Sequence, residues 1–135
     1  MKAKIRKHTI VTRSLEESSM RQGIYDVPVF IALIKHERNR VDRDGKEFAL
    51  TIFQTEGLGT WNSVEIIAQI KKCIRTIDEV GWLDEKNIGV LLPATTMDGG
   101  HRFARRVIGH ELLAGGAKPA IPFRVYSYPR HWIST

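Results

Sequence analysis

This chain lacks several features that commonly reveal a function. It contains a single cysteine, Cys73, so no disulfide can form within the chain. Cys73 lies among the apolar residues of a predicted helix, which indicates a buried, reduced thiol without a redox role. The five histidines form no pair at helical i, i+4 spacing and have no cysteine partner. We therefore predict no zinc or other metal site and no cofactor.

Long apolar runs are also missing. None approaches the roughly 20 residues that span a bilayer, and the basic N-terminus lacks the apolar segment of a signal peptide. We therefore expect a cytoplasmic protein with no membrane partner. The chain does have 42% hydrophobic residues, enough for one core in 135 residues, and a formal net charge of +6. This charge is compatible with anionic partners, but the basic residues are interspersed with acidic ones, as on solvated helix faces.

The chain divides into an arm and one domain. Residues 1–25 are polar and basic, with a short strand predicted at residues 8–12, and we interpret them as a basic N-terminal arm. Residues 26–135 form the domain. It begins with a helix that Asp26 caps, with Pro28 in its first turn. The apolar positions of this helix lie at helical spacing: Phe30, Leu33, Ile34 and Val41.

The elements that follow are predicted in the order strand, helix, strand, strand, helix, strand. They are a strand at 48–53, a helix with an apolar stripe from Ile66 to Ile77, a hairpin with its turn at 84–87, a helix from about 100 that ends at Gly115–Gly116, and a strand at 121–126. This is the βαββαβ order of ferredoxin-like folds, in which two helices pack on one face of an antiparallel sheet. The predicted class is therefore α+β, a ferredoxin-like sandwich with an extra N-terminal helix.

Residues 75–95 carry a motif that resembles a known family. Arg75-Thr76-Ile77-Asp78 is followed after five residues by Asp84-Glu85-Lys86-Asn87-Ile88, a short apolar strand, Pro93 and Thr95. This ungapped run and the order of elements resemble the GGDEF domains, diguanylate cyclases of nucleotide-cyclase-like fold that make cyclic di-GMP from two GTP molecules. The resemblance covers roughly residues 28–127 and identifies the chain as a degenerate GGDEF-like domain.

The departures from the family pattern fall on its active site. In the family, two glycines let the hairpin approach the substrate phosphates, and two acidic residues bind a divalent metal. Here Asp84-Glu85 occupies the glycine positions and Lys86-Asn87 the acidic ones, and the second metal ligand of the family falls on Gln54. Because a hard divalent cation prefers carboxylates and the reaction depends on that metal, we expect no cyclase activity.

Arg75 and Asp78 match the inhibitory site of the family, which binds cyclic di-GMP as a product. The resemblance implies that they hold this ligand, since arginine forks onto phosphate and aspartate accepts hydrogen bonds from guanine. Trp82 on the same hairpin is a candidate for stacking on a base. A structural role explains the same residues, because a helix C-terminus favours a cation and aspartate is common at the start of a turn. The sequence leaves both interpretations open.

The resulting hypothesis is a catalytically inactive regulatory or protein-interaction domain. Its expected partners are cyclic di-GMP and a second copy of the chain or another protein. Two alternatives remain. One is a nucleotide-binding protein with residual nucleotidyl chemistry on Glu56, Asp84 or Glu85. The other is a basic nucleic-acid-binding domain, which is less favoured because the predicted strands lack the aromatic and basic pattern of RNA-binding sheets.

Overall fold

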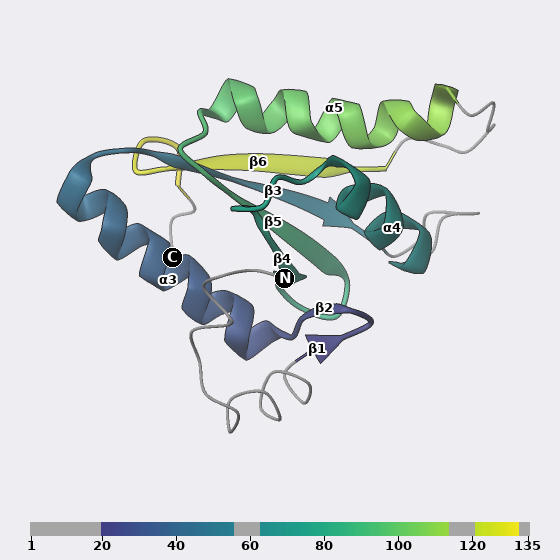
Figure 1. The fold of residues 1–135 in the computed structure, drawn as a ribbon, viewed down its shortest axis with the longest axis horizontal. Helices are drawn as coiled ribbons and strands as arrows, with labels where there is room; N and C mark the ends of the chain where they lie inside the picture. Colours follow the sequence, from purple (N-terminus) through teal and green to yellow (C-terminus); the bar gives the residue numbers. More distant parts are fainter. Residues whose placement is uncertain (1–19, 56–62, 114–120, 133–135) are drawn as a thin grey trace.

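The computed structural model describes residues 20–55, 63–113 and 121–132, and for residues 110–113 it describes the backbone alone. The strands are β1 (Met20–Arg21), β2 (Ile24–Tyr25), β3 (Phe48–Gln54), β4 (Glu79–Trp82), β5 (Asn87–Pro93) and β6 (Phe123–Tyr128), and the helices are α3 (Val27–Asp44), α4 (Ser63–Cys73) and α5 (Met97–Leu113). The strands form one open sheet in the order β1-β2-β4-β5-β3-β6 (Figure 1).

The part of the chain from β3 to β6 has the predicted βαββαβ order. β3 pairs antiparallel with β5 on one side and with β6 on the other, and β4 pairs antiparallel with β5. The spatial order β4-β5-β3-β6 is that of a ferredoxin-like sheet. The extra N-terminal helix is α3. The structure therefore confirms the predicted fold class.

The sheet separates two apolar cores. Alternate residues of β3 point to opposite faces, so that Ala49 and Phe53 belong to the core under α4 and α5, whereas Leu50 and Ile52 belong to the core under α3. α4 and α5 cover one face together and α3 covers the other (Figure 1). The prediction that α4 and α5 share a face is confirmed.

Two glycines of the hairpin make room for α3. Gly81 of β4 and Gly89 of β5 lie opposite each other in register. The ring of Phe30, fully buried, packs over both. A Cβ atom on Gly81 would lie 2.4 Å from Cγ of Phe30, and one on Gly89 would lie 2.7 Å from Cε2 of the same ring. The absence of side chains at these positions therefore brings the helix close to the sheet.

α3 starts where the sequence predicts, and a glycine ends it. Asp26 is the N-cap, and its side chain accepts a hydrogen bond of 2.9 Å from the N–H of Val27. At the other end Gly45 adopts a left-handed conformation with φ of 77° and donates its N–H to the carbonyl of Val41. Glycine at this position stops the helix without strain.

The predicted ends of α4 and α5 need correction. α4 ends at Cys73, and Ile77, predicted on its apolar stripe, is 47% exposed. The Asp78 carboxylate accepts the N–H of Arg75, which would otherwise continue the helical ladder. α5 begins at Met97 because Thr96 caps it by accepting the N–H of Gly99. The predicted helix end at Gly115–Gly116 lies outside the described residues.

Part of the predicted arm is attached to the sheet. Residues 20–25 form the β1–β2 hairpin, and β2 pairs in parallel with β4 through Tyr25 and Gly81. Ile24 and Tyr25 are both buried. Two buried residues are too few to give a periodic pattern, so the sequence did not predict this hairpin. The strand predicted at residues 8–12 lies outside the described part of the chain.

The last strand is shifted by two residues from its predicted position, because β6 begins at Phe123 rather than Ile121. The residue before it, Pro122, has no N–H to donate to a ladder, although its carbonyl accepts the N–H of Gln54. Among the described residues, no helix has both the length and the apolar character to cross a membrane.

Candidate functional site

Arg75 and Asp78 form an ion pair in the turn between α4 and β4. Nη2 of Arg75 lies 2.8 Å from Oδ1 of Asp78, and the backbone N–H of Arg75 donates to Oδ2 at 2.7 Å. The carboxylate of Asp78 is almost completely buried at 1% exposure, whereas the side chain of Arg75 is 50% exposed. The structure therefore brings the two predicted ligand-binding residues together, with Asp78 turned inward and Arg75 facing solvent.

The guanidinium of Arg75 also ties the turn to the end of the hairpin. Nη2 donates to the carbonyl of Pro93 and to the hydroxyl of Thr95, both at 3.1 Å. The Thr95 hydroxyl in turn donates to the Pro93 carbonyl at 2.9 Å. These bonds hold Arg75 in one orientation at the junction of α4, β5 and α5, so it has a structural role whether or not it binds a ligand.

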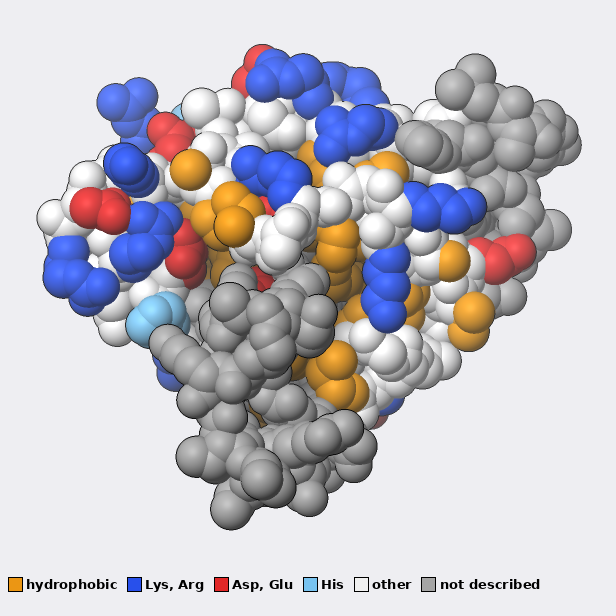
Figure 2. Space-filling model, viewed as in Figure 1, with side chains coloured by type: hydrophobic (Ala, Val, Ile, Leu, Met, Phe, Trp, Pro, Cys, Tyr) orange, Lys and Arg blue, Asp and Glu red, His pale blue; other side chains and the backbone are white. Residues whose placement is uncertain are grey.

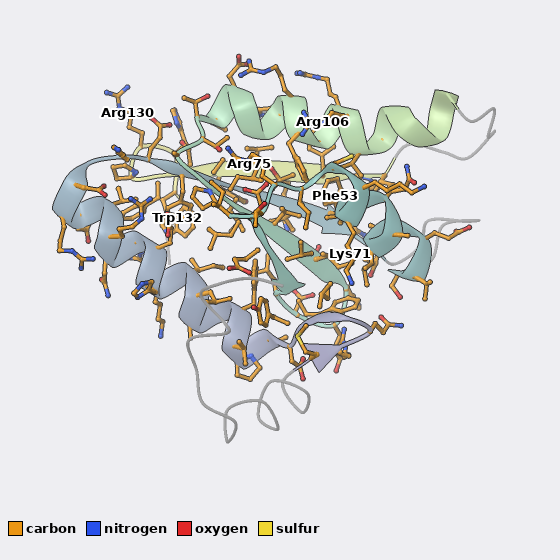
Figure 3. All side chains as sticks on the ribbon, in the orientation of Figure 1. Phe53, Lys71, Arg75, Arg106, Arg130 and Trp132 are labelled. Atoms are coloured by element: carbon orange, nitrogen blue, oxygen red, sulfur yellow. The ribbon has the colours of Figure 1, made fainter. Side chains whose placement is uncertain are left out.

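Arg75 lines a pocket of about 220 Å³ between this junction and α5. Two further arginines, Arg102 and Arg106, line the same pocket from successive turns of α5, and Gly99 lines it too. Figure 3 labels Arg75 and, on α5, Arg106. Nη2 of Arg106 donates to the carbonyl of Cys73 at the end of α4. Lys and Arg side chains gather along α5 on the face seen in Figure 2. We call the hollow lined by Arg75, Arg102 and Arg106 the arginine pocket.

Trp82, proposed from the sequence as a stacking surface, is not part of this pocket. Its side chain is 2% exposed and belongs to the core under α4 and α5. The indole N–H donates to the carbonyl of Arg21 at 3.0 Å, and the guanidinium of Arg21 lies 3.8 Å from the ring centroid. The tryptophan therefore anchors the β1–β2 hairpin to the sheet.

The tip of the hairpin is ordered by Asp84. Its carboxylate accepts the backbone N–H of Lys86 at 2.7 Å and the side-chain amide of Asn87 at 3.0 and 3.1 Å. Partial burial tends to raise the pKa of Asp84, but these hydrogen bonds, with a contribution from the charge of Arg124, lower it overall. Glu85 is exposed at the tip, and Ile88 is fully buried in the core. Glu56 lies outside the described residues.

Replacing Asp84 with alanine is expected to lower the free energy of unfolding by about 1 kcal/mol at neutral pH, since the turn is largely exposed. Because the pKa of Asp84 is lowered by folding, its carboxylate stabilises the protein above the ordinary pKa of 3.8, and this contribution disappears as the pH falls through the lowered value. Urea unfolding of both proteins between about pH 7 and pH 2 should show the difference shrinking in acid. A difference that is independent of pH would contradict this assignment.

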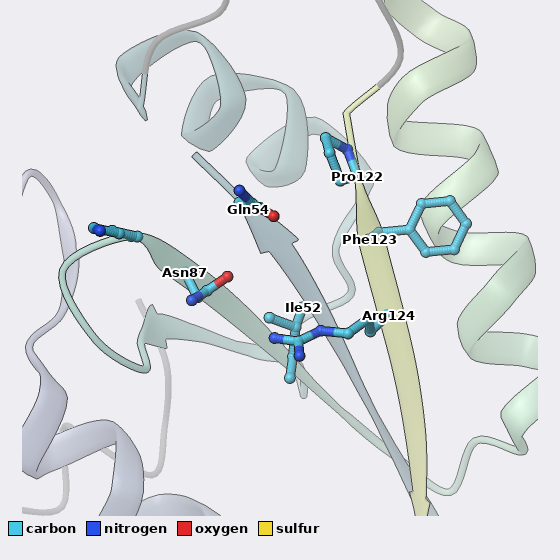
Figure 4. A pocket seen from close by; sticks show the side chains of 7 residues that line it. Ile52, Gln54, Asn87, Pro122, Phe123 and Arg124 are labelled. Carbon is cyan, nitrogen blue, oxygen red and sulfur yellow. The ribbon is translucent and has the colours of Figure 1, made fainter. Parts of the chain in front are cut away.

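Gln54, the last residue of β3, lies opposite Asn87 at the start of β5. They are paired residues in the β3–β5 ladder, which places the positions that the resemblance assigned to metal binding side by side. Both line a pocket of about 520 Å³ together with Lys86 and Arg124 (Figure 4). We call this hollow the Gln54 pocket. The backbone of Lys86 is fixed there, because its carbonyl accepts both the N–H and the hydroxyl of Thr55.

No family model matches the sequence, and no curated protein matches it significantly. Solved structures do match the fold. A DGC protein from Thermotoga maritima has a TM-score of 0.65 at 16% identity, over 82% of this chain and 86% of that one. The GGDEF domain of YfiN from Pseudomonas aeruginosa has a TM-score of 0.67 at 16% identity, over 82% and 80%. The fold is that of a GGDEF domain.

A third GGDEF structure was solved with a ligand. The GGDEF domain of DgcB from Caulobacter crescentus, in complex with c-di-GMP, matches with a TM-score of 0.64 at 7% identity, over 81% of this chain and 75% of that one. At these identities the likeness concerns the GGDEF fold. The fold agrees with the resemblance seen in the sequence. The ligand of this chain depends on its own pocket residues.

The divalent metal that the GGDEF resemblance implies does not fit the residues of this chain. Gln54 and Asn87 offer neutral amides, and the amide nitrogen of Asn87 already donates to Asp84. Lys86, next to them, carries a positive charge. In the part of the chain that the structure describes, no group of three His, Cys, Asp or Glu residues is placed to hold a metal ion. A hard dication would meet cations and amides where it needs carboxylates.

The sequence analysis did not assign three arginines to these pockets. Arg102 and Arg106 are spaced four residues apart in α5, a spacing that puts both on one side of a helix, and this could have been noticed. Their position above Arg75 depends on how α5 packs on the sheet. Arg124 enters the Gln54 pocket because it pairs with Ile52 in the β3–β6 ladder, a register that no local pattern predicts.

Proposed function

We propose that this chain is a cytoplasmic regulatory domain that binds cyclic di-GMP in the arginine pocket and does not synthesise it. One observation carries the proposal, which is that Arg75, Arg102 and Arg106 line one pocket. Guanidinium groups recognise phosphate oxygens and stack on or fork against guanine. Related GGDEF folds solved with c-di-GMP make this ligand the first to test. A second copy of the chain or a separate protein would respond to the bound state.

In this proposal Arg75 contacts the ligand and Asp78 positions Arg75. The Asp78 carboxylate is 1% exposed and already accepts bonds from the backbone and the guanidinium of Arg75, so it is poorly placed to accept from guanine. Holding Arg75 in place beforehand reduces the side-chain entropy that binding would cost. Arg102 is paired with Asp98, but this pair is exposed on both sides and a phosphate can displace the carboxylate at little cost.

Calorimetric titration with cyclic di-GMP is expected to give saturable heat with the wild-type chain. Arg102→Ala should weaken binding about tenfold or more, since a charge-assisted hydrogen bond contributes about 1.5–3 kcal/mol. Arg105→Ala is the matched control: it removes an exposed arginine from the same helix that does not line the pocket, and it should leave the affinity within about twofold apart from general screening.

Arg75→Ala should weaken cyclic di-GMP binding at least as much as Arg102→Ala. Because it also removes a partner of the buried Asp78 carboxylate, its folding must be checked by circular dichroism, and the double variant Arg75→Ala/Asp78→Asn relieves the unpaired charge. No heat with the wild type, or equal losses for Arg102→Ala and Arg105→Ala, would refute a cyclic di-GMP site in the arginine pocket.

Incubation of the chain with GTP and Mg²⁺ is expected to leave the nucleotide unchanged. The positions that would hold the metal carry Gln54 and Asn87, with Lys86 beside them, and phosphoryl transfer depends on metal to neutralise developing charge. Chromatography of the reaction mixture measures this directly, with a known diguanylate cyclase as the positive control. Formation of cyclic di-GMP that is lost in Asn87→Ala would overturn this part of the proposal.

A further inference from the structure

The Gln54 pocket is built from three adjacent strands rather than from one loop. Ile52 and Gln54 lie on the same face of β3, and their ladder partners are Arg124 of β6 and Asn87 of β5. These four side chains therefore project from one face of the sheet, around a hollow of about 520 Å³ (Figure 4). A site on paired strands is held more firmly than one on a single loop.

Among the residues that the structure describes, those that line the Gln54 pocket include cations and amides but no acid. Lys86 and Arg124 supply positive charge, and Gln54 and Asn87 supply amide groups. The carboxylate of Asp84 in the adjoining turn accepts hydrogen bonds from the Lys86 N–H and the Asn87 amide, and the charge of Arg124 acts on it as well. Its charge is thus partly neutralised inside the turn, and Glu85 beside it is exposed at the tip.

We propose that the Gln54 pocket binds a small anion bearing a diphosphate group directly, without a divalent metal. Arg124 forks onto phosphate oxygens, and Lys86 in the turn of the hairpin adds a positive charge. The amide of Gln54 can donate to a further oxygen. The same charges that exclude a metal dication from Gln54 and Asn87 therefore attract the anion that a metal would otherwise neutralise.

The test is calorimetry of the full chain with inorganic diphosphate in buffer containing EDTA, at constant ionic strength. We expect saturable binding that weakens about tenfold or more in Arg124→Ala and in Lys86→Ala. Arg130→Ala, at an exposed position in the turn after β6 and outside the pocket lining, is the matched control and should bind within about twofold of wild type. The side chains of Arg124 and Lys86 are both exposed, so these variants should remain folded.

Adding Mg²⁺ should change the apparent affinity for diphosphate in opposite directions, depending on whether the site binds the free anion or needs a metal. If the protein binds the free anion, Mg²⁺ lowers the apparent affinity because it sequesters diphosphate in solution. If the site needs a metal, Mg²⁺ raises the affinity, and that result would overturn the proposal. A parallel titration with GDP tells whether an organic part adds to the diphosphate, since tighter binding than inorganic diphosphate indicates contacts beyond the phosphates.

The arginine pocket is the rival location for the same anion, and the variants separate the two. Diphosphate binding that is lost in Arg102→Ala and kept in Arg124→Ala would contradict this inference. Absence of binding at millimolar diphosphate would contradict it as well. Conversely, Arg124→Ala should leave cyclic di-GMP binding unchanged, so the proposed receptor function can fail or survive independently of the Gln54 pocket.

Discussion

Replacing Asp78 with alanine is expected to lower the free energy of unfolding by about 3 kcal/mol, equivalent to a fall in melting temperature of about 10 °C. The carboxylate is 1% exposed and accepts both the backbone N–H and the guanidinium of Arg75. Its loss leaves that N–H without its acceptor where α4 ends, and it leaves Arg75 held only by its bonds to Pro93 and Thr95. Urea denaturation measures the change.

Asp98→Ala is the matched control for Asp78→Ala. Asp98 is also paired with an arginine, Arg102, but the two side chains are 79% and 63% exposed. An exposed pair of this kind contributes less than about 1 kcal/mol. If Asp78→Ala proved as mild as Asp98→Ala, the Arg75–Asp78 pair would be a surface contact and Asp78 would have no positioning role.

Gly81→Ala is expected to destabilise the domain by about 3 kcal/mol, because the new Cβ would lie 2.4 Å from the fully buried ring of Phe30. The ring is held between α3 and the hairpin, so it can move away only if α3 shifts from the sheet. Thermal or urea unfolding of the variant measures the effect. The double variant Gly81→Ala/Phe30→Leu should recover part of the stability, because the smaller side chain relieves the clash.

Gly109→Ala provides the control for this prediction. A Cβ at Gly109 would meet nothing within 4 Å, and the residue lies in α5. Alanine there should be neutral or stabilising by up to about 1 kcal/mol. Equal losses for the two glycine variants would show that Phe30 does not pack against the hairpin as the structure places it.

The fold was predictable because its signals are local. The continuous apolar run of β3, the Asp26 cap, the Gly45 stop and the apolar stripe of α4 each indicate one element, and their order selects the βαββαβ topology. The errors occurred where a side chain competes with the backbone. The Asp78 carboxylate ends α4 before the end of its predicted apolar stripe, and α5 begins at Met97, before its predicted start near residue 100, where the Thr96 hydroxyl caps it. Side-chain caps of this kind depend on rotamers that a periodicity argument does not contain.

The candidate site was less predictable because its parts meet through tertiary packing. The motif analysis found Arg75 and Asp78, yet the burial that turns Asp78 into a positioning residue follows from its place between α4 and β4. Trp82 has an aromatic ring that could stack on a base, but the ring is buried in the core. Arg102 and Arg106 of α5 line the same pocket as Arg75, which lies on another element. Their spacing in the sequence does not predict this proximity, because it depends on how α5 packs against the sheet.

The β4–β5 hairpin thus keeps the strand pairing of the fold, while its two ends differ in chemistry. One end lies by the arginine pocket, next to the Arg75–Asp78 ion pair. The other end carries an Asp84 turn and a cationic hollow where the resemblance implies a metal. We propose an anionic ligand at each end, cyclic di-GMP in the arginine pocket and a diphosphate in the Gln54 pocket.

The most direct test is a titration of the ¹⁵N-labelled chain with cyclic di-GMP, followed by backbone amide shifts. The account predicts that Thr95, Gly99 and Arg102 shift in proportion to saturation, while Lys86 and Asn87 of the Gln54 pocket stay in place. No shift at a saturating concentration would contradict the proposed receptor function. Shifts confined to Lys86 and Asn87 would place the ligand in the wrong pocket and would equally contradict it.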